Sequence, residues 1–159
     1  ALNSPASGQS SITPMSVVAN LRAATKRQAL TELARRAAPL AKRDERSIFE
    51  VLWERERLGS TGIGMGTAMP HGKLPRLDRL YGLFARLDRP IPFDAIDDQP
   101  VDLIFLLLAP ENAGADHLKA LARVARLFRD RIVCAKLRGT DRAEALYALL
   151  TDRATSHAA

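Results

Sequence analysis

Apolar residues in the first third of the chain recur with the spacing of two amphipathic helices. The first is predicted over residues 26–38, and Pro39 is expected to end it. Asp44 is a candidate N-cap for the second helix, which Gly59 is expected to end. The predicted inner face of the second helix consists of Ile48, Val51, Leu52 and Leu58. The charges of residues 54–57 alternate in sign, which is typical of a solvated helix face.

The middle of the chain predicts strands, and the last third returns to helical spacing. Residues 81–87 and the apolar run 101–109 are expected to be strands, the latter buried. A helix is expected from Asp116, followed by shorter helices over 133–137 and 142–150. The predicted inner face of the long helix consists of Leu118, Leu121, Ala122, Ala125 and Phe128. This order indicates an α/β or α+β fold in which helices cover a small sheet.

The length and composition fit a single domain. The chain has 159 residues, of which 47% are hydrophobic, enough for one ordinary core. Residues 1–14 are uncharged and rich in Ser, Pro and Gly, so we expect a mobile tail there, then one domain over 15–152 and a flexible tail over 153–159. The single cysteine, Cys134, excludes an internal disulfide and any cluster that needs several cysteine ligands.

The charge balance leaves several kinds of partner open. The formal net charge is +6, but acidic residues are interspersed with the basic ones, and only 5% of the residues are aromatic. A stacking surface for single-stranded nucleic acid is therefore not expected. The longest apolar run has a length suited to a buried strand rather than a membrane span, so membrane insertion is not expected either.

A glycine-rich segment, residues 60–73, is the part of the sequence that most suggests chemistry. It lacks the glycine spacing of a dinucleotide-binding motif and the Gly-Lys-Ser/Thr of a P-loop. Two interpretations remain from the residues alone. The backbone N–H groups between Thr61 and Gly66 either form a small anion-binding concavity or belong to a tight turn without a ligand.

Two histidines are candidates for the chemistry. His71 stands between Pro70 and Gly72 on a rigid, uncrowded backbone, where a neutral imidazole can act as a nucleophile; the alternative is a hydrogen-bonded histidine at a strand end. His117 lies at the expected start of a helix, where it either donates an N–H to a bound anion or caps the helix. No cysteine ligands or HExxH motif accompany them, so we expect no metal site.

Three segments carry a family resemblance: GSTGIGMGTAMPHGK at 59–73, PIPFDAIDDQPVDLIFLLLAPE at 90–111 and HLKALARVARLF at 117–128. Together they resemble the enzyme IIA component of the bacterial phosphotransferase system, most closely its nitrogen-regulatory type, which is related to the mannitol and fructose IIA domains. The resemblance implies an α/β sandwich in which helices flank a small mixed sheet. The sequence departs from the family pattern at Met65, where asparagine is expected.

The resemblance also implies a set of site residues. His71 corresponds to the phosphorylated histidine, His117 to the second histidine of the site, and Arg55 to a basic residue that precedes the glycine segment; the alternative for Arg55 is a solvated helix position. Hydrogen-bond donors to the phosphoryl group are then expected from Thr61, Gly62, Gly64, Gly66 and Gly72.

The partners implied by the resemblance are proteins. The phosphoryl group is expected to come from an HPr-like phosphocarrier that enzyme I charges with phosphoenolpyruvate, and the cytoplasmic acceptor is expected to regulate target proteins of nitrogen or potassium metabolism without any cofactor. A sugar-specific IIA that passes phosphate to a IIB domain is the first alternative. The second is a basic binding module, for nucleic acid or signalling, in which His71 does not react.

Overall fold

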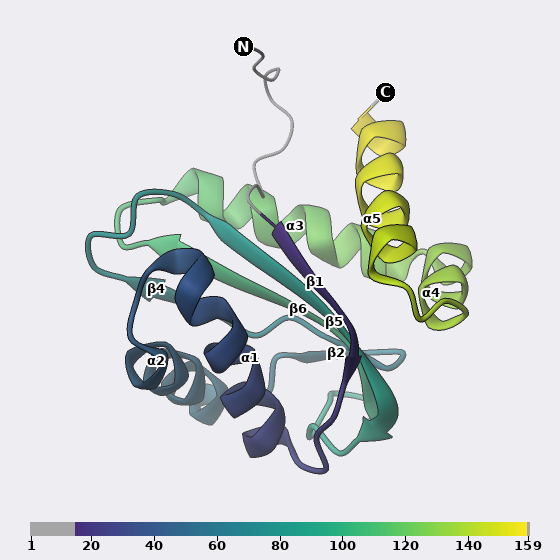
Figure 1. Ribbon diagram of the computed structural model, residues 1–159, viewed down its shortest axis with the longest axis horizontal. Helices are drawn as coiled ribbons and strands as arrows, with labels where there is room; N and C mark the ends of the chain where they lie inside the picture. Colours follow the sequence, from purple (N-terminus) through teal and green to yellow (C-terminus); the bar gives the residue numbers. More distant parts are fainter. Residues whose placement is uncertain (1–14, 159) are drawn as a thin grey trace.

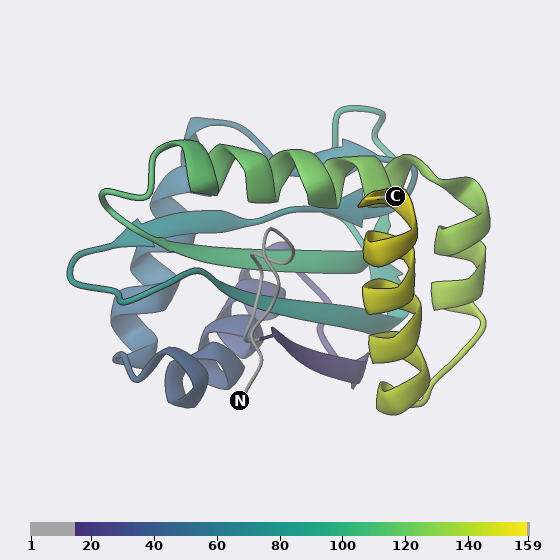
Figure 2. The same cartoon turned by 90° about the horizontal axis from the view of Figure 1, so that it is seen from above.

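The protein is a three-layer α/β sandwich (Figure 1), seen in a computed structural model that describes residues 15–158, with side chains for 15–151. Helices α1 and α2 lie on one face of a six-stranded sheet, and α3, α4 and α5 lie on the other (Figure 2). The expected mixed sheet flanked by helices is therefore confirmed. The predicted N-terminal tail, residues 1–14, lies outside the described residues.

The elements follow one another in the order β1-α1-α2-β2-β3-β4-β5-β6-α3-α4-α5. The strands are β1 (Met15–Leu21), β2 (Gly62–Gly64), β3 (Thr67–Ala68), β4 (His71–Leu74), β5 (Tyr81–Ile91) and β6 (Val101–Pro110). The helices are α1 (Lys26–Ala41), α2 (Glu45–Leu58), α3 (Ala115–Arg129), α4 (Arg131–Arg138) and α5 (Ala143–Ala158).

Strand β6 is the centre of the sheet and divides the core in two. It pairs antiparallel with β5 and parallel with both β3 and β4. Because successive side chains of a strand point to opposite faces, the apolar run of β6 contributes side chains to the cores on both faces of the sheet. Ile104 and Leu106 pack in the core under α1 and α2, whereas Phe105 and Leu107 pack in the core under α3, α4 and α5.

The glycine segment forms short strands along one side of β6. Thr67 and Ala68 of β3 pair with the start of β6, and β4 resumes the pairing further along with His71 opposite Leu107. Pro70 interrupts the edge between them because it has no N–H, although its carbonyl still accepts from Leu107 N at 3.0 Å. This interruption places His71 at the first position of a new strand.

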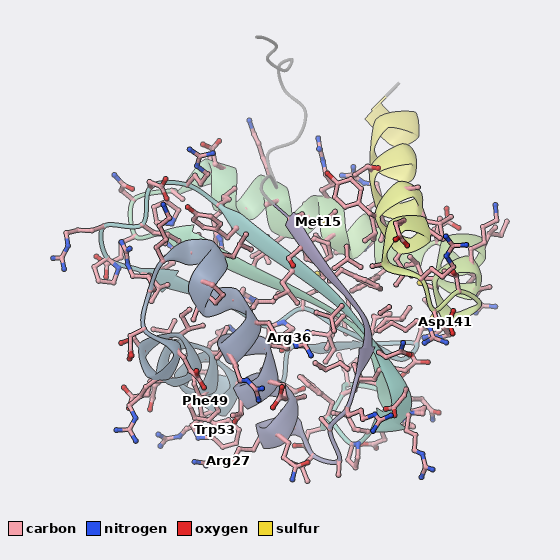
Figure 3. The ribbon with its side chains drawn as sticks, in the orientation of Figure 1. Met15, Arg27, Arg36, Phe49, Trp53 and Asp141 are labelled. Carbon is pink, nitrogen blue, oxygen red and sulfur yellow. The ribbon has the colours of Figure 1, made fainter. Side chains whose placement is uncertain are left out.

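Helices α1 and α2 also contact each other at the surface. The guanidinium of Arg27 in α1 lies 5.3 Å from the ring centroid of Phe49 and 5.2 Å from that of Trp53, both in α2 (Figure 3). The two rings are stacked, with centroids 5.8 Å apart. These cation–π contacts help to fix the angle between the two helices.

The structure corrects several boundaries predicted from the sequence. Helix α1 continues through Pro39 to Ala41, and α5 extends to Ala158 instead of ending at 150. Strand β1 was not predicted, since its residues show no clear alternation. Leu58, expected on the inner face of α2, is 85% exposed because it lies at the end of the helix, beyond the sheet-facing row.

Most of the inner face of α3 was predicted about one position away from the observed one, although Phe128 was predicted correctly. Leu118 is 66% exposed, whereas the buried residues are His117, Ala120, Val124, Leu127 and Phe128. The sequence analysis gave His117 a role at the helix start, as a donor to an anion or as a cap, and did not include it in the inner face. The structure instead turns this histidine inward, toward the end of the sheet where β4 begins.

Candidate functional site

The two candidate histidines lie side by side. His71 begins β4, and His117 comes from the first turn of α3. Their ring centroids are 5.6 Å apart with the planes tilted by 54°. His71 is half-buried, whereas His117 is 5% exposed and its Nδ1 has no hydrogen-bond partner among the described residues.

One hydrogen bond fixes which nitrogen of His71 can react. Nδ1 lies 2.9 Å from the carbonyl oxygen of Met69. Because a carbonyl oxygen only accepts, Nδ1 carries the proton in this bond, and the lone pair of the neutral ring is on Nε2. The bond also orients the ring, so Nε2 is the candidate nucleophile.

Both rings are held in the neutral form. Burial lowers the pKa of His71 below its usual 6.5, and the charge of Arg55 lowers it further, while the Met69 carbonyl and the Glu56 carboxylate act in the opposite direction. Burial also lowers the pKa of His117, with smaller contributions from His71 and Lys73. Each imidazole is therefore mostly unprotonated at neutral pH.

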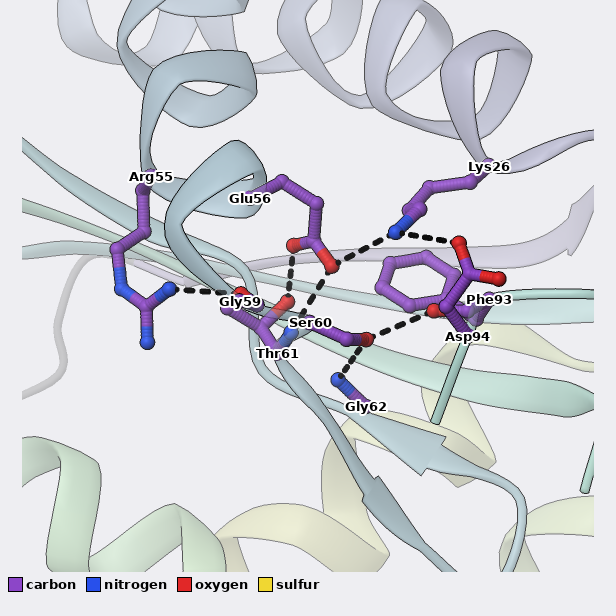
Figure 4. A network of polar contacts seen from close by, with 9 residues as sticks. All are labelled: Lys26, Arg55, Glu56, Gly59, Ser60, Thr61, Gly62, Phe93 and Asp94. Atoms are coloured by element: carbon purple, nitrogen blue, oxygen red, sulfur yellow. Dashed lines mark hydrogen bonds and ion pairs between the residues drawn. The ribbon is translucent and has the colours of Figure 1, made fainter. Parts of the chain in front are cut away.

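Arg55 belongs to the same neighbourhood but makes a different contact. Its Nη1 donates to the carbonyl oxygen of Gly59 at 2.8 Å, which satisfies a carbonyl group at the end of α2 (Figure 4). The residue is half-buried and close enough to His71 for its charge to lower the histidine pKa. The structure thus brings Arg55, His71 and His117 together.

The donors expected from Thr61 and Gly62 already have partners inside the protein. The N–H and hydroxyl of Thr61 both donate to the Glu56 carboxylate, at 2.9 and 2.6 Å. The N–H of Gly62 donates to Ser60 Oγ, and that of Met65 donates to Asp97 Oδ2. These bonds hold the β2–β3 hairpin in place. To bind a phosphate, the same N–H and hydroxyl groups would have to give up their present acceptors, so their phosphate-binding role stays a prediction.

The glycines of this segment are explained by packing and turn geometry. A Cβ on Gly62 would lie 2.8 Å from Ala95 Cβ, and one on Gly72 would lie 2.2 Å from Val51 Cγ1 of α2. Gly64 and Gly66 have φ of +105° and +78°, which side chains disfavour. The close packing of α2 on β4 leaves no room for a side chain at position 72, which explains the glycine next to His71.

Glu56 is a site residue that the sequence analysis missed. Its charged neighbours predicted a solvated helix face, yet Glu56 is only 5% exposed. Its carboxylate binds Thr61 and also pairs with Lys26 Nζ at 3.2 Å. A signal was present, because Glu56 continues the row of Ile48 and Leu52 at four-residue spacing on the buried side of α2.

The described residues contain no group of three or more His, Cys, Asp or Glu side chains that could hold a metal ion. None of the described helices combines the length and apolar character needed to cross a membrane.

Comparison with known proteins gives consistent results. Residues 10–153 match the family model described as phosphoenolpyruvate-dependent sugar phosphotransferase system, EIIA 2. A nitrogen regulatory protein of Bradyrhizobium diazoefficiens is 58% identical over 139 residues, which cover 87% of this chain and 91% of that protein. The crystal structure of nitrogen regulatory protein IIA-Ntr from Neisseria meningitidis superposes with a TM-score of 0.81 at 36% identity, covering 85% of this chain and 92% of that one.

A more distant structure shares the fold. It is the complex of the mannitol enzyme IIA with its phosphorylated enzyme IIB from Escherichia coli, matched with a TM-score of 0.71 at 20% identity over 86% of this chain and 94% of that one.

Proposed function

Because the chain belongs to the EIIA 2 family of the phosphoenolpyruvate-dependent sugar phosphotransferase system, we propose that it accepts a phosphoryl group on Nε2 of His71 and regulates other proteins. The observation that carries the proposal is the His71 ring itself. It is half-buried, neutral, oriented by Met69 and adjacent to a second neutral imidazole. The donor in this proposal is a phosphohistidine of an HPr-like carrier, and the reaction takes place in the cytoplasm.

The proposed transfer conserves charge and protons. The Nε2 lone pair of His71 attacks phosphorus in line while the P–N bond of the carrier's phosphohistidine, which is protonated on its other ring nitrogen, breaks; the bonding pair stays on the carrier ring, which leaves as a neutral imidazole. The His71 ring becomes cationic and keeps its Nδ1–H on Met69. His117 donates a ring N–H to a phosphoryl oxygen, and Arg55 exchanges its bond to Gly59 for one to the phosphoryl group.

The first experiment measures intact mass after incubation with enzyme I, the carrier and phosphoenolpyruvate. Wild type is expected to gain one acid-labile phosphoryl group, and His71→Ala to gain none. His117→Ala is expected to gain the group more slowly. His157→Ala is the matched control because it removes the third histidine of the sequence and is expected to behave as wild type. Full labelling of His71→Ala would remove the assignment.

Regulation is favoured over sugar transport by the 58% identity to a protein named nitrogen regulatory protein. In a deletion strain of the source organism, we expect altered potassium or nitrogen responses with normal sugar uptake. Loss of uptake of one sugar, restored by the wild-type chain but not by His71→Ala, would instead support transfer to a IIB domain. Binding to DNA that is unaffected by His71→Ala and weakens steeply with salt would support the non-reacting module.

A further inference from the structure

A continuous series of hydrogen bonds connects Glu56 of α2 to His71 of β4. The Glu56 carboxylate accepts two bonds from Thr61, at 2.9 Å from its N–H and 2.6 Å from its hydroxyl (Figure 4). The carbonyl oxygen of Thr61 accepts from Met69 N at 2.9 Å. The carbonyl oxygen of Met69 in turn accepts from His71 Nδ1 at 2.9 Å. Each of these hydrogen bonds restrains the position of the next residue, from Glu56 to the ring of His71.

We infer that Glu56 is a positioning residue for phosphoryl transfer, which holds the reactive tautomer and orientation of His71 through Thr61 and Met69. The inference rests on the proposed function of His71, although its structural part applies to the unphosphorylated protein as well. Glu56 does not touch the reacting atoms and acts only through its neighbours.

The surroundings of Glu56 are those of a fixed carboxylate. Its side chain is 2% exposed, and Lys26 Nζ lies 3.2 Å from Oε2 and 3.1 Å from Asp94 Oδ2. Leaving a buried carboxylate without its partners is costly, so Thr61 is held firmly against it. Ser60 reinforces the same turn by donating its hydroxyl to the Phe93 carbonyl at 2.7 Å.

The charge of Glu56 suits the transfer as well as its geometry does. When Nε2 of His71 forms a bond to phosphorus, the ring becomes cationic, and a nearby carboxylate stabilises that cation. In the unphosphorylated protein the same carboxylate acts to raise the pKa of His71, against the larger effect of burial.

Glu56→Gln and Thr61→Val separate the charge of Glu56 from its hydrogen bonds, and two further variants are controls. Glu56→Gln keeps the side-chain shape but removes the charge, and its single amide oxygen cannot accept both Thr61 donors as the carboxylate does. Thr61→Val removes only the hydroxyl, while Thr61→Ser retains it. Asp94→Asn is the matched control because it removes a carboxylate that pairs with Lys26 and leaves the bonds between Glu56 and Thr61 intact.

The first readout is the imidazole nitrogen NMR spectrum of the unphosphorylated protein, which reports the tautomer and pKa of His71. In wild type we expect the proton on Nδ1. In Glu56→Gln we expect a smaller fraction of this tautomer and a lower His71 pKa, because the carboxylate that raises it is gone. Thr61→Val is expected to shift the tautomer, and Thr61→Ser and Asp94→Asn to match wild type.

The second readout is the rate of phosphoryl gain from the carrier at saturating carrier concentration. Glu56→Gln is expected to be slower by about tenfold with a little-changed KM, since a displaced nucleophile loses alignment rather than carrier binding. A folded Glu56→Gln variant with wild-type nitrogen signals and rate would overturn the inference. If that variant does not fold, equal spectra and rates for Thr61→Val and Thr61→Ser would overturn it.

The two proposals fail in different ways. If wild type gains no phosphoryl group, the proposed function is wrong, and the NMR comparison still tests the link between Glu56 and His71. If wild type is phosphorylated and Glu56→Gln is indistinguishable from it in both readouts, only the positioning role is wrong.

Discussion

Gly72→Ala tests whether the close approach of α2 to β4 requires a glycine beside His71. In a strand without steric conflict this change stabilises a protein by about 0.5–1 kcal/mol, because glycine loses more backbone freedom on folding. Here the new Cβ would lie 2.2 Å from Val51 Cγ1, far inside van der Waals contact. Overpacking of this kind costs about 1–3 kcal/mol, so the repulsion outweighs the backbone gain.

The expected net effect is a destabilisation of about 1–2 kcal/mol, measured as a lower urea midpoint, with a decrease in Tm of roughly 2–4 °C for each kcal/mol. Val51→Ala provides the second arm of a double-mutant cycle. It removes Cγ1, and the next Val51 atom, Cβ, lies 3.5 Å from the added methyl group, which is ordinary contact.

The double variant Gly72→Ala/Val51→Ala is therefore expected to be more stable than the sum of the single changes by about 1–3 kcal/mol. Additivity of the two changes within about 0.5 kcal/mol would refute the steric argument. A stabilised Gly72→Ala single variant would refute it too, since the backbone term would then be the only one acting.

Three further predictions concern the hairpin and the histidines. Met65 has φ of +56° and is 41% exposed, so Met65→Asn is expected to stabilise the protein by about 1 kcal/mol in urea unfolding, and a loss of stability would contradict the assigned strain. Because the folded-state pKa values of His71 and His117 lie below 6.5, the unfolded chain binds more protons under mildly acidic conditions; stability should therefore fall as the pH decreases through 6.5, and His117→Gln should show a smaller fall than wild type. Arg138 bonds both Asp102 oxygens at 2.9 and 3.0 Å and the Met65 carbonyl at 2.8 Å, so Arg138→Met is expected to cost about 1.5–3 kcal/mol of unfolding free energy, and an unchanged urea midpoint would show that these bonds contribute little.

Local patterns in the sequence were sufficient for the helices and for the two long strands, β5 and β6. The apolar run of β6 and the helical periodicity of α1 and α2 identify their elements because burial on a strand or helix leaves a regular imprint on the chain. The Pro-His-Gly sequence indicated His71 as the candidate nucleophile, since Pro70 fixes its own φ and Gly72 leaves the space beside the imidazole uncrowded.

The tertiary structure decided which side chains meet. Strand β1 forms because β5 offers it a parallel partner, and pairing with a distant strand leaves little trace in seven residues. The contact between His71 and His117 arises because the His71 ring lies against the first turn of α3, which comes from a distant part of the chain. Glu56 looked like one of four alternating charges, and the packing of α2 against Thr61 and Lys26 decides that it is a buried carboxylate with fixed partners. Sequence alone specifies residues and local periodicity, whereas burial and hydrogen-bond partners depend on segments that are far apart in the chain, and these determine what each polar group does.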